Sequence, residues 1–269
     1  MHMRTTRLGI TILGGLLAAT APQSPAVADA ALEAVRASVR LHGGGESGTG
    51  FLVAVPDGGP LLLVSAAHTF AGIDGSTCTV VGRLPAAGRG FERREVVVPV
   101  RAEKKPLWRR HPSLDVAVMP VSLPEEIAAA AFPLSRLATE ADFDSGKVRV
   151  GQRVRVACFP AQVEANAAGW PVLRTGSIAS HPLLPAAKLE RFFVDYSNFG
   201  GDSGAAVVAE PIIEAGSPLV VGVVVAMQRQ TDRTTSPFEE TVRHTPLGLA
   251  ISVPSPRLLE LIEKRDPKP

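Results

Sequence analysis

A serine, a histidine and an aspartate in this chain occupy local contexts that suit covalent catalysis. Ser203 lies in the segment GGDSG at 200–204, directly before the apolar run AAVV at 205–208. Glycine has no Cβ, so a glycine-rich turn can adopt strained conformations and let a substrate carbonyl approach the backbone. Such a turn presents a hydroxyl beside free backbone N–H groups. The hydroxyl becomes a nucleophile only if a base and a carboxylate elsewhere in the chain activate it.

The candidate base and carboxylate are His68 and Asp115. His68 lies in VSAAHTF at 64–70, where an apolar run gives way to a loop, and Asp115 opens the run DVAV at 115–118. Taken singly, a histidine or an aspartate at a strand end is more often structural than catalytic. Together the three residues follow the order His, Asp, Ser, each in a recognisable context. This combination predicts that His68 accepts the proton of Ser203 and that Asp115 orients the imidazole.

The elements that must position these residues are expected to be short strands. The chain has 269 residues, of which 45% are apolar and only 5% aromatic, so its core must be built mainly from Val, Leu, Ile and Ala. Its 23 prolines and 25 glycines separate Val-rich runs, as in strands joined by tight turns. These runs form two β-rich blocks, which favours paired barrels or sandwiches. The first block has predicted strands at 50–55, 61–65, 79–81, 95–98 and 116–119, and the second at 148–157, 176–179, 192–194, 205–208, 219–226 and 249–251.

Two segments outside these blocks have helical character. Residues 123–147 are rich in alanine and charge and are predicted to be a linker with a helical turn. Residues 257–264 follow Pro256 with helical periodicity, which predicts a terminal helix docked on the fold.

The first 28 residues have the pattern of a signal peptide. Arg4 and Arg7 precede an apolar stretch at 8–19, and AVA at 26–28 is a small-x-small cleavage site. We therefore expect an exported protein, secreted or held in the periplasm or cell envelope, whose mature chain begins near Asp29. The apolar stretch is short for a bilayer span. An N-terminal membrane anchor is the alternative.

Charge argues against a nucleic-acid or anionic-membrane role. The chain carries 28 basic and 26 acidic side chains, and the excess is accounted for by the two arginines of the leader, so the remainder has no net formal charge. A nucleic-acid or membrane partner calls for a concentrated basic face. One basic cluster, at 101–111, is interpreted as a solvated loop.

Cys78 and Cys158 are the two cysteines. An even count in an oxidising compartment allows one disulfide. The two residues lie in different blocks, each beside apolar neighbours, so buried free thiols are favoured over a bridge. No Cys/His spacing resembles a metal site, and neither a metal nor a cofactor is expected.

With these motifs in order, the chain resembles the trypsin/chymotrypsin-type serine proteases, and among them the bacterial secreted branch that includes the Deg/HtrA-type protease domain. The resemblance covers roughly residues 40–262. The three triad boxes are its specific part. The matching segments are SGTGFLV at 47–53, SAAH at 65–68, DVAV at 115–118, Asp195, GDSG at 201–204 and GLAISVP at 248–254.

The resemblance implies an all-β fold of two six-stranded antiparallel Greek-key β-barrels with a C-terminal helix, in one protease domain at 29–269. The first barrel would span about 40–122, the linker about 123–147, the second barrel about 148–254 and the helix about 255–265. No PDZ domain is expected within the residues that follow Pro254. Asp202 would need a partner other than a new N-terminus, since no Ile-Val-Gly-Gly-like start is present, and an arginine is one candidate.

By the same resemblance, the enzyme would be a serine endopeptidase acting on protein or peptide substrates through an acyl-enzyme, and we expect a monomer. The N–H groups of Gly201 and Ser203 would form the oxyanion hole. The strand Val225, Ala226 and Met227 would pair with the substrate backbone. Ser197 would lie at the floor of the primary specificity pocket, where the lack of an acid disfavours cleavage after Lys or Arg and favours a small or medium apolar side chain. Arg229 could instead favour an acidic one.

Two other readings stay open at this point. A secreted homologue could keep the barrels as a binding protein without turnover. The order Ser203, Asp232, His244 is also that of an α/β-hydrolase esterase. That motif, however, wants glycine where Ala205 stands and a helix where a strand-like run follows.

Overall fold

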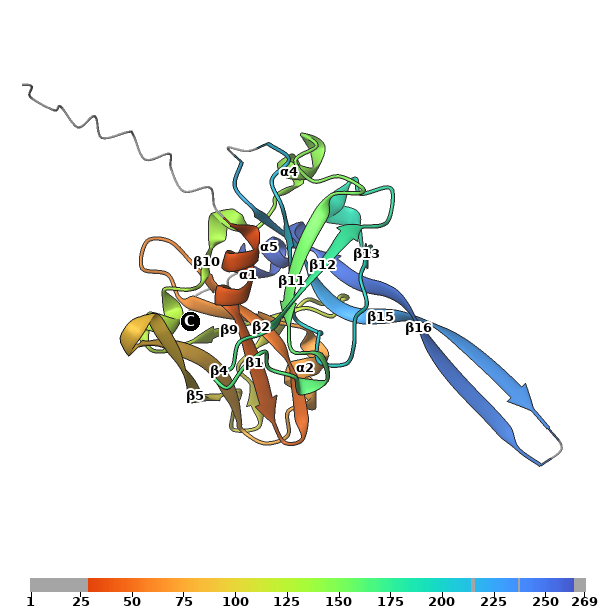
Figure 1. The fold of residues 1–269 in the computed structure, drawn as a ribbon, viewed down its shortest axis with the longest axis horizontal. Helices are drawn as coiled ribbons and strands as arrows, with labels where there is room; N and C mark the ends of the chain where they lie inside the picture. Colours follow the sequence, from red (N-terminus) through yellow and green to blue (C-terminus); the bar gives the residue numbers. More distant parts are fainter. Residues whose placement is uncertain (1–28, 214–215, 237, 264–269) are drawn as a thin grey trace, which may run out of the picture.

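A computed structural model describes residues 29–213, 216–236 and 238–263, and these form two β lobes with a long hairpin projecting from the second (Figure 1). The predicted signal peptide lies outside the described residues. In the first lobe the elements are α1 (Ala30–Ala37), β1 (Ser38–Gly43), β2 (Glu46–Ala54), β3 (Leu61–Ser65), α2 (Ala67–Gly72), β4 (Thr77–Ala86), β5 (Gly90–Pro99), β6 (Arg101–Ala102), β7 (Lys105–Pro106), β8 (Arg109–Arg110) and β9 (Ala117–Val121). The connection and second lobe contain α3 (Glu125–Ala128), β10 (Phe132–Pro133), α4 (Glu140–Asp144), β11 (Arg153–Cys158), β12 (Val172–Ile178), β13 (Phe192–Asp195), β14 (Ala206–Ala209), β15 (Leu219–Thr235), β16 (Glu240–Pro254) and α5 (Ser255–Glu263).

The first lobe is one eight-stranded sheet in the order β5-β4-β1-β2-β3-β9-β8, with β10 paired in parallel to β2. The central strands of this sheet are buried on both faces. One face fills a core that includes Val39, Leu41, Leu52, Leu63 and Phe70, and the other contributes Phe51 and Val64 to a second core. Successive side chains of a strand point to opposite faces, so one strand can supply both cores. The sheet carries β3 and β9, the two strands that end and begin beside His68 and Asp115.

The second lobe is a closed barrel in the order β11-β12-β13-β16-β15-β14. Because β11 pairs with β14, the two ends of the sheet meet and the edge strands are paired there. Its core is rich in valine and includes Val154, Val156, Val194, Val207 and Val221. This barrel places the Ser203 turn at the start of β14.

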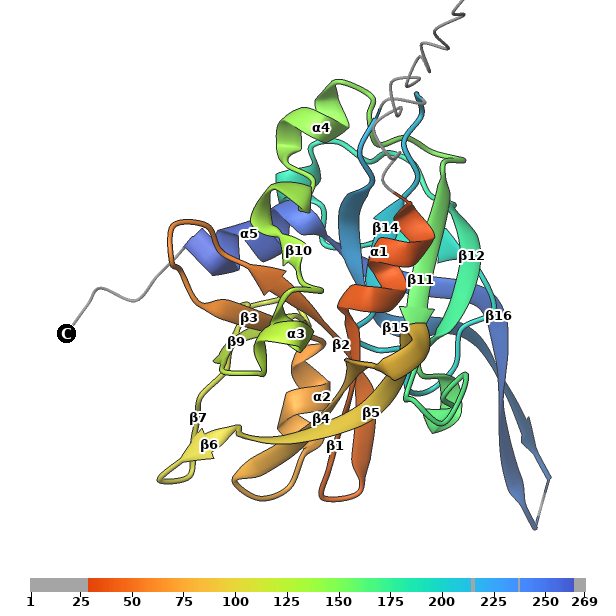
Figure 2. The same cartoon turned by 60° about the vertical axis from the view of Figure 1, so that its left-hand side comes forward.

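Two helices help to join the lobes (Figure 2). The apolar face of α1 packs into a core cluster that contains Phe51 of the first sheet and Val208 of the second, together with Leu258 of α5. Asp29 caps α1, because its Oδ1 accepts the Ala31 N–H at 2.9 Å. An N-terminal cap of this kind satisfies a donor that the helix cannot. The two lobes therefore share an apolar core cluster.

The hairpin of β15 and β16 extends far beyond the barrel (Figure 1). Its pairing continues from Gly222 with Pro254 to Thr235 with Glu240. Beyond Gln228 on β15, and before Gly248 on β16, its described residues are exposed. The sequence predicts that this strand ends at 226, because the outer part is polar on both faces and lacks the alternation by which a half-buried strand is recognised.

The predicted fold class is confirmed: the chain is mostly β, with a closed six-stranded barrel in the second lobe and a C-terminal helix. Several elements escaped prediction, among them α1 and β1, whose sequences are short and mix apolar with charged residues. In the basic cluster, His111 is buried rather than solvated, and its Nδ1 accepts the Leu114 N–H at 3.2 Å. Within the described part of the chain no helix is long and apolar enough to cross a membrane.

Candidate active site

His68 and Asp115 contact each other directly within the first lobe. His68 Nδ1 lies 2.5 Å from Asp115 Oδ2, and the His68 backbone N–H donates to Asp115 Oδ1 at 2.9 Å. A carboxylate only accepts, so the proton of a neutral His68 ring is on Nδ1 and Nε2 carries the lone pair. Nε2 is therefore the atom that can act as a base.

Local chain geometry brings the two residues together. His68 sits in the first turn of α2, which follows β3 directly, and the Ala67 N–H donates to the Asp115 carbonyl at 3.3 Å. Asp115 follows a tight turn that is held from within, since His111 accepts backbone N–H groups from Ser113 and Leu114 at 3.3 and 3.2 Å. The buried histidine thus fixes the loop that carries the carboxylate.

The contact favours the charged form of both side chains, so it shifts the pKa of each. The hydrogen bond to Asp115 raises the pKa of His68 above its ordinary value of 6.5, although burial by itself would lower it. Burial would by itself raise the pKa of Asp115, but the hydrogen bonds and charge of His68 bring it below its ordinary value. The side chain of His68 is 47% exposed and that of Asp115 is 38% exposed. Water therefore screens the pair, and a ligand can reach it.

Ser203 is half-buried, and its backbone carbonyl lies near the residue that follows His68. A Cβ on Gly48 would lie 2.7 Å from Thr69 Cγ2 and 3.3 Å from the Ser203 carbonyl oxygen, so the residue after His68 and the serine meet across this glycine. The Ser203 Oγ donates to the Val225 carbonyl at 3.4 Å. Within the described residues it makes no hydrogen bond to His68. Transfer of its proton to His68 would require the hydroxyl to rotate away from Val225.

Several backbone N–H groups of the turn that contains Ser203, including that of Gly200, have no hydrogen-bond partner among the described residues. The Asp202 N–H donates to the Phe199 carbonyl at 3.1 Å, which closes a turn around Gly200 and Gly201. Among the described residues the N–H groups of Gly201 and Ser203 have no hydrogen-bond partner. Gly201 has φ +97°, and a Cβ there would collide with the Phe159 carbonyl oxygen, so only glycine fits. The N–H groups of Gly201 and Ser203 are the two expected for the oxyanion hole.

Asp202 is buried beneath this turn and its partners are now evident. Its Oδ2 accepts the Phe199 N–H at 3.0 Å and lies 3.5 Å from the Tyr196 hydroxyl. The sequence suggested an arginine, and Arg174 does contribute its charge, but the donors to Oδ2 are a backbone amide and a phenol. Burial raises the pKa of Asp202 above its ordinary value, and the Phe199 N–H, Cys158, Arg174 and Tyr196 oppose that rise.

The predicted substrate-binding residues lie on the segment beside Ser203. Val225 is buried and offers the carbonyl contacted by Ser203, whereas Ala226 is exposed and its carbonyl accepts from Asn198 Nδ2 at 3.2 Å. Met227 continues this strand toward the projecting hairpin. Ser197 is exposed, and its place at the floor of a specificity pocket stays a prediction.

The residues of the esterase hypothesis, Ser203, Asp232 and His244, do not form a site. Asp232 and His244 lie on the exposed hairpin, where His244 Nδ1 is 2.8 Å from Thr231 Oγ1 and Asp232 accepts from Gln230 at 2.8 Å. Ser203 is followed by the strand β14 in an all-β fold, not by a helix. The α/β-hydrolase reading is therefore wrong.

The cysteines are separate, and no metal site accompanies the triad residues. Cys78 and Cys158 are both buried and free, as favoured from the sequence. Burial raises the pKa of Cys78 to about 11, so its thiol is protonated and unreactive. In the described part of the chain no cluster of three His, Cys, Asp or Glu could hold a metal ion.

Sequence comparisons find little. No protein-family model matches the chain, and no curated protein is similar to it in sequence. Solved structures do match, among them Rv3671c from M. tuberculosis H37Rv in the inactive form of a serine-to-alanine mutant. That chain is 18% identical, the match covers 91% of this chain and 97% of the other, and the TM-score is 0.47.

Sequence reasoning did not single out the residues that hold the Ser203 turn. Thr49 and Ser65 belong to matched segments, but only the structure shows what they contact. Ser65 Oγ donates to the Thr49 carbonyl at 2.7 Å, and the Thr49 N–H donates to the Ser203 carbonyl at 3.0 Å. A small hydroxyl residue at a buried strand position was the available signal.

Proposed function

We propose that this protein is a secreted serine endopeptidase that uses His68, Asp115 and Ser203 as a catalytic triad. The observation that carries the proposal is the two-point contact between Asp115 and His68, which leaves His68 Nε2 free as a base. Two unused N–H groups beside Ser203 supply the second requirement of acyl transfer, a site for an oxyanion. Gly48 of the first lobe lies close both to Thr69, the residue after His68, and to the Ser203 carbonyl oxygen, which supports placing these two features together.

The reaction would proceed through an acyl-enzyme. Ser203 Oγ attacks the carbonyl carbon of the scissile bond while His68 Nε2 takes the hydroxyl proton. The N–H groups of Gly201 and Ser203 stabilise the oxyanion, and Asp115 stabilises the imidazolium. His68 then gives its proton to the leaving amine as the C–N bond breaks. A water molecule then gives a proton to His68 as its oxygen attacks the acyl carbon. The ester bond to Ser203 Oγ breaks, His68 returns the proton to Oγ, and the acid leaves.

The substrate backbone would bind along the strand Val225, Ala226 and Met227. The Val225 carbonyl, which now accepts the Ser203 hydroxyl, would accept an N–H of the substrate instead and so release the hydroxyl toward His68. With Ser197 at the floor of the primary pocket, an uncharged small or medium apolar side chain is proposed for the residue before the cleaved bond. The signal-peptide pattern at 1–28 supports action outside the cytoplasm.

Labelling with a fluorophosphonate probe tests the triad. The probe phosphonylates an activated serine with loss of fluoride, so the native chain should label and the Ser203→Ala variant should not. His68→Ala should also abolish labelling, while His244→Ala, on the exposed hairpin, should label as the native chain does. A native chain that is folded but never labels would instead favour the binding-protein reading. Cleavage-site profiling in a peptide library would then define the preferred side chain.

A further inference from the structure

The hydroxyl of Thr49 joins three segments that are distant in sequence. Thr49 is buried in β2 of the first lobe. Its Oγ1 donates to the Gly201 carbonyl at 2.7 Å and accepts the Phe159 N–H at 3.1 Å. One side chain of the first sheet therefore holds both the Ser203 turn and the loop that follows β11.

That loop also holds the turn directly. The Ala161 N–H donates to the Gly200 carbonyl at 2.7 Å. Ala161 and Gln162 have φ +47° and +67°, a region that costs a residue with a side chain about 1–3 kcal/mol. Such backbone conformations persist only where neighbouring contacts impose them. The loop therefore needs an anchor.

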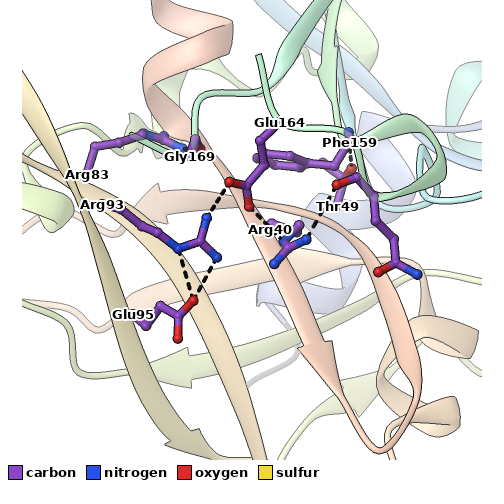
Figure 3. A network of polar contacts seen from close by, with 9 residues as sticks. Arg40, Thr49, Arg83, Arg93, Glu95, Phe159, Glu164 and Gly169 are labelled. Carbon is purple, nitrogen blue, oxygen red and sulfur yellow. Dashed lines mark hydrogen bonds and ion pairs between the residues drawn. The ribbon is translucent and has the colours of Figure 1, made fainter. Parts of the chain in front are cut away.

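The anchor is a set of charged contacts to the first lobe (Figure 3). Arg40 Nε on β1 lies 3.1 Å from Glu164 Oε1, and Arg93 on β5 contacts the other carboxylate oxygen of Glu164. Arg83 Nη1 donates to the Gly169 carbonyl at 3.2 Å. Because Arg40, Arg83 and Arg93 all belong to the first sheet, the loop is fixed to that sheet and not to its own barrel alone.

These contacts determine where the Gly201 N–H points. A peptide unit is planar and trans, so its N–H points opposite to its C=O. When Ala161 holds the Gly200 carbonyl, the Gly201 N–H of the same peptide must face away from the loop. Thr49 fixes the next peptide through the Gly201 carbonyl. If these two carbonyls were released, the turn could rotate and withdraw the donor.

We propose that Thr49 is a positioning residue that keeps the Gly201 N–H aimed at the oxyanion, with the loop anchored by Glu164 as its second support. The proposal rests on the proposed endopeptidase function and adds how its oxyanion hole is held open. The first lobe would then supply the shape of the hole as well as the base and the carboxylate.

Paired variants of the full chain test this. Thr49→Val keeps the shape but removes the hydroxyl, leaving the Gly201 carbonyl and the Phe159 N–H unsatisfied. With a peptide substrate, kcat should fall about 100-fold while KM stays within about twofold, since the oxyanion forms only in the transition state. Thr49→Ser keeps the hydroxyl and should restore kcat to within a few-fold. Equal kcat for Thr49→Val and the native chain, or no rescue by serine, would overturn the proposal.

A second measurement decides the matter without turnover. In amide hydrogen exchange, residues 199–205 should exchange about tenfold faster in Thr49→Val than in Thr49→Ser, while β4 exchanges alike in both. Thr49→Ala, which leaves room for a water, should give the same result if the valine variant does not fold. Unchanged exchange at 199–205 would refute the positioning role even in a labelling enzyme. Conversely, a native chain that never labels refutes the endopeptidase but leaves this measurement decisive for Thr49.

Discussion

Asp115 contacts His68 at two atoms: its Oδ2 lies 2.5 Å from the ring Nδ1, and its Oδ1 lies 2.9 Å from the backbone N. A single contact would leave the ring free to turn about it, whereas two contacts fix both the backbone and the imidazole. The arrangement selects the tautomer in which Nε2 is bare. This pair is the part of the site from which the sharpest predictions follow.

The pH dependence of hydrolysis should report His68. Only neutral His68 can accept a proton, and its hydrogen bond to Asp115 raises its pKa above 6.5. The value of kcat/KM should therefore rise with pH with an apparent pKa above 6.5. An apparent pKa below that value, or a flat profile between pH 5 and 9, would contradict the assignment of the base.

Replacement of Asp115 by asparagine should uncouple the pair. The amide cannot stabilise an imidazolium and can donate to Nδ1, which favours the wrong tautomer, so kcat should fall about 10⁴-fold. The pKa of His68, followed by NMR of its ring protons, should fall toward its ordinary value. A loss smaller than tenfold with a folded protein would show that another group orients His68.

Gly204 should tolerate no side chain. It has φ +92°, and a Cβ would collide with the Thr49 carbonyl oxygen and with Ser65 Oγ. Gly58 is a matched control, since it has φ +72° but no neighbour within 4 Å of a Cβ. In chemical denaturation, Gly58→Ala should lose about 1–2 kcal/mol from backbone conformation alone. Gly204→Ala should lose clearly more or fail to fold, and equal losses would argue against the close packing of β2 on the turn.

Asp202 should make stability fall as pH rises. Its pKa is raised in the folded state by burial, so the folded protein holds this proton more tightly than the unfolded chain. The resulting stabilisation is complete below pH 3.8 and is lost as pH rises through the folded-state pKa. Asp202→Asn removes this titration and keeps an oxygen for the Phe199 N–H. Its free energy of unfolding relative to the native chain should increase between pH 4 and 7, and a constant difference would contradict the shift.

The Glu164 anchor should matter more than an exposed ion pair. Glu164→Gln leaves Arg40, whose side chain is only 15% exposed, without its carboxylate. Its cost should be about 1–2 kcal/mol in chemical denaturation, between the values for surface and buried pairs. The control is Glu240→Gln, which breaks the exposed pair with Arg233 on the hairpin and should cost less than about 0.5 kcal/mol. Equal costs would show that the loop is not held by this contact.

Much of the architecture could be predicted from local sequence because its signals are local. Val-rich runs between turn residues located most strands of both lobes, and the periodicity of 257–264 located α5. The hairpin beyond residue 226 could not be found this way, because its pairing is carried by the backbone and its exposed side chains show no alternation. The eighth strand of the first sheet, β10, has only two residues and is defined by its pairing with β2.

For the site, the sequence by itself determined the chemical identities and order of His68, Asp115 and Ser203. Each of them lies in a short sequence motif that can be recognised without knowledge of the other two. Only the tertiary structure decided what surrounds them: that Ser203 donates to Val225, that Asp202 is held by Phe199 and Tyr196, and that the cysteines are apart. The hydroxyl of Thr49 reaches a carbonyl 152 residues away. Such contacts leave no pattern in the chain, because every residue carries the same backbone carbonyl and amide. Which pairs of them meet depends on how the two lobes pack.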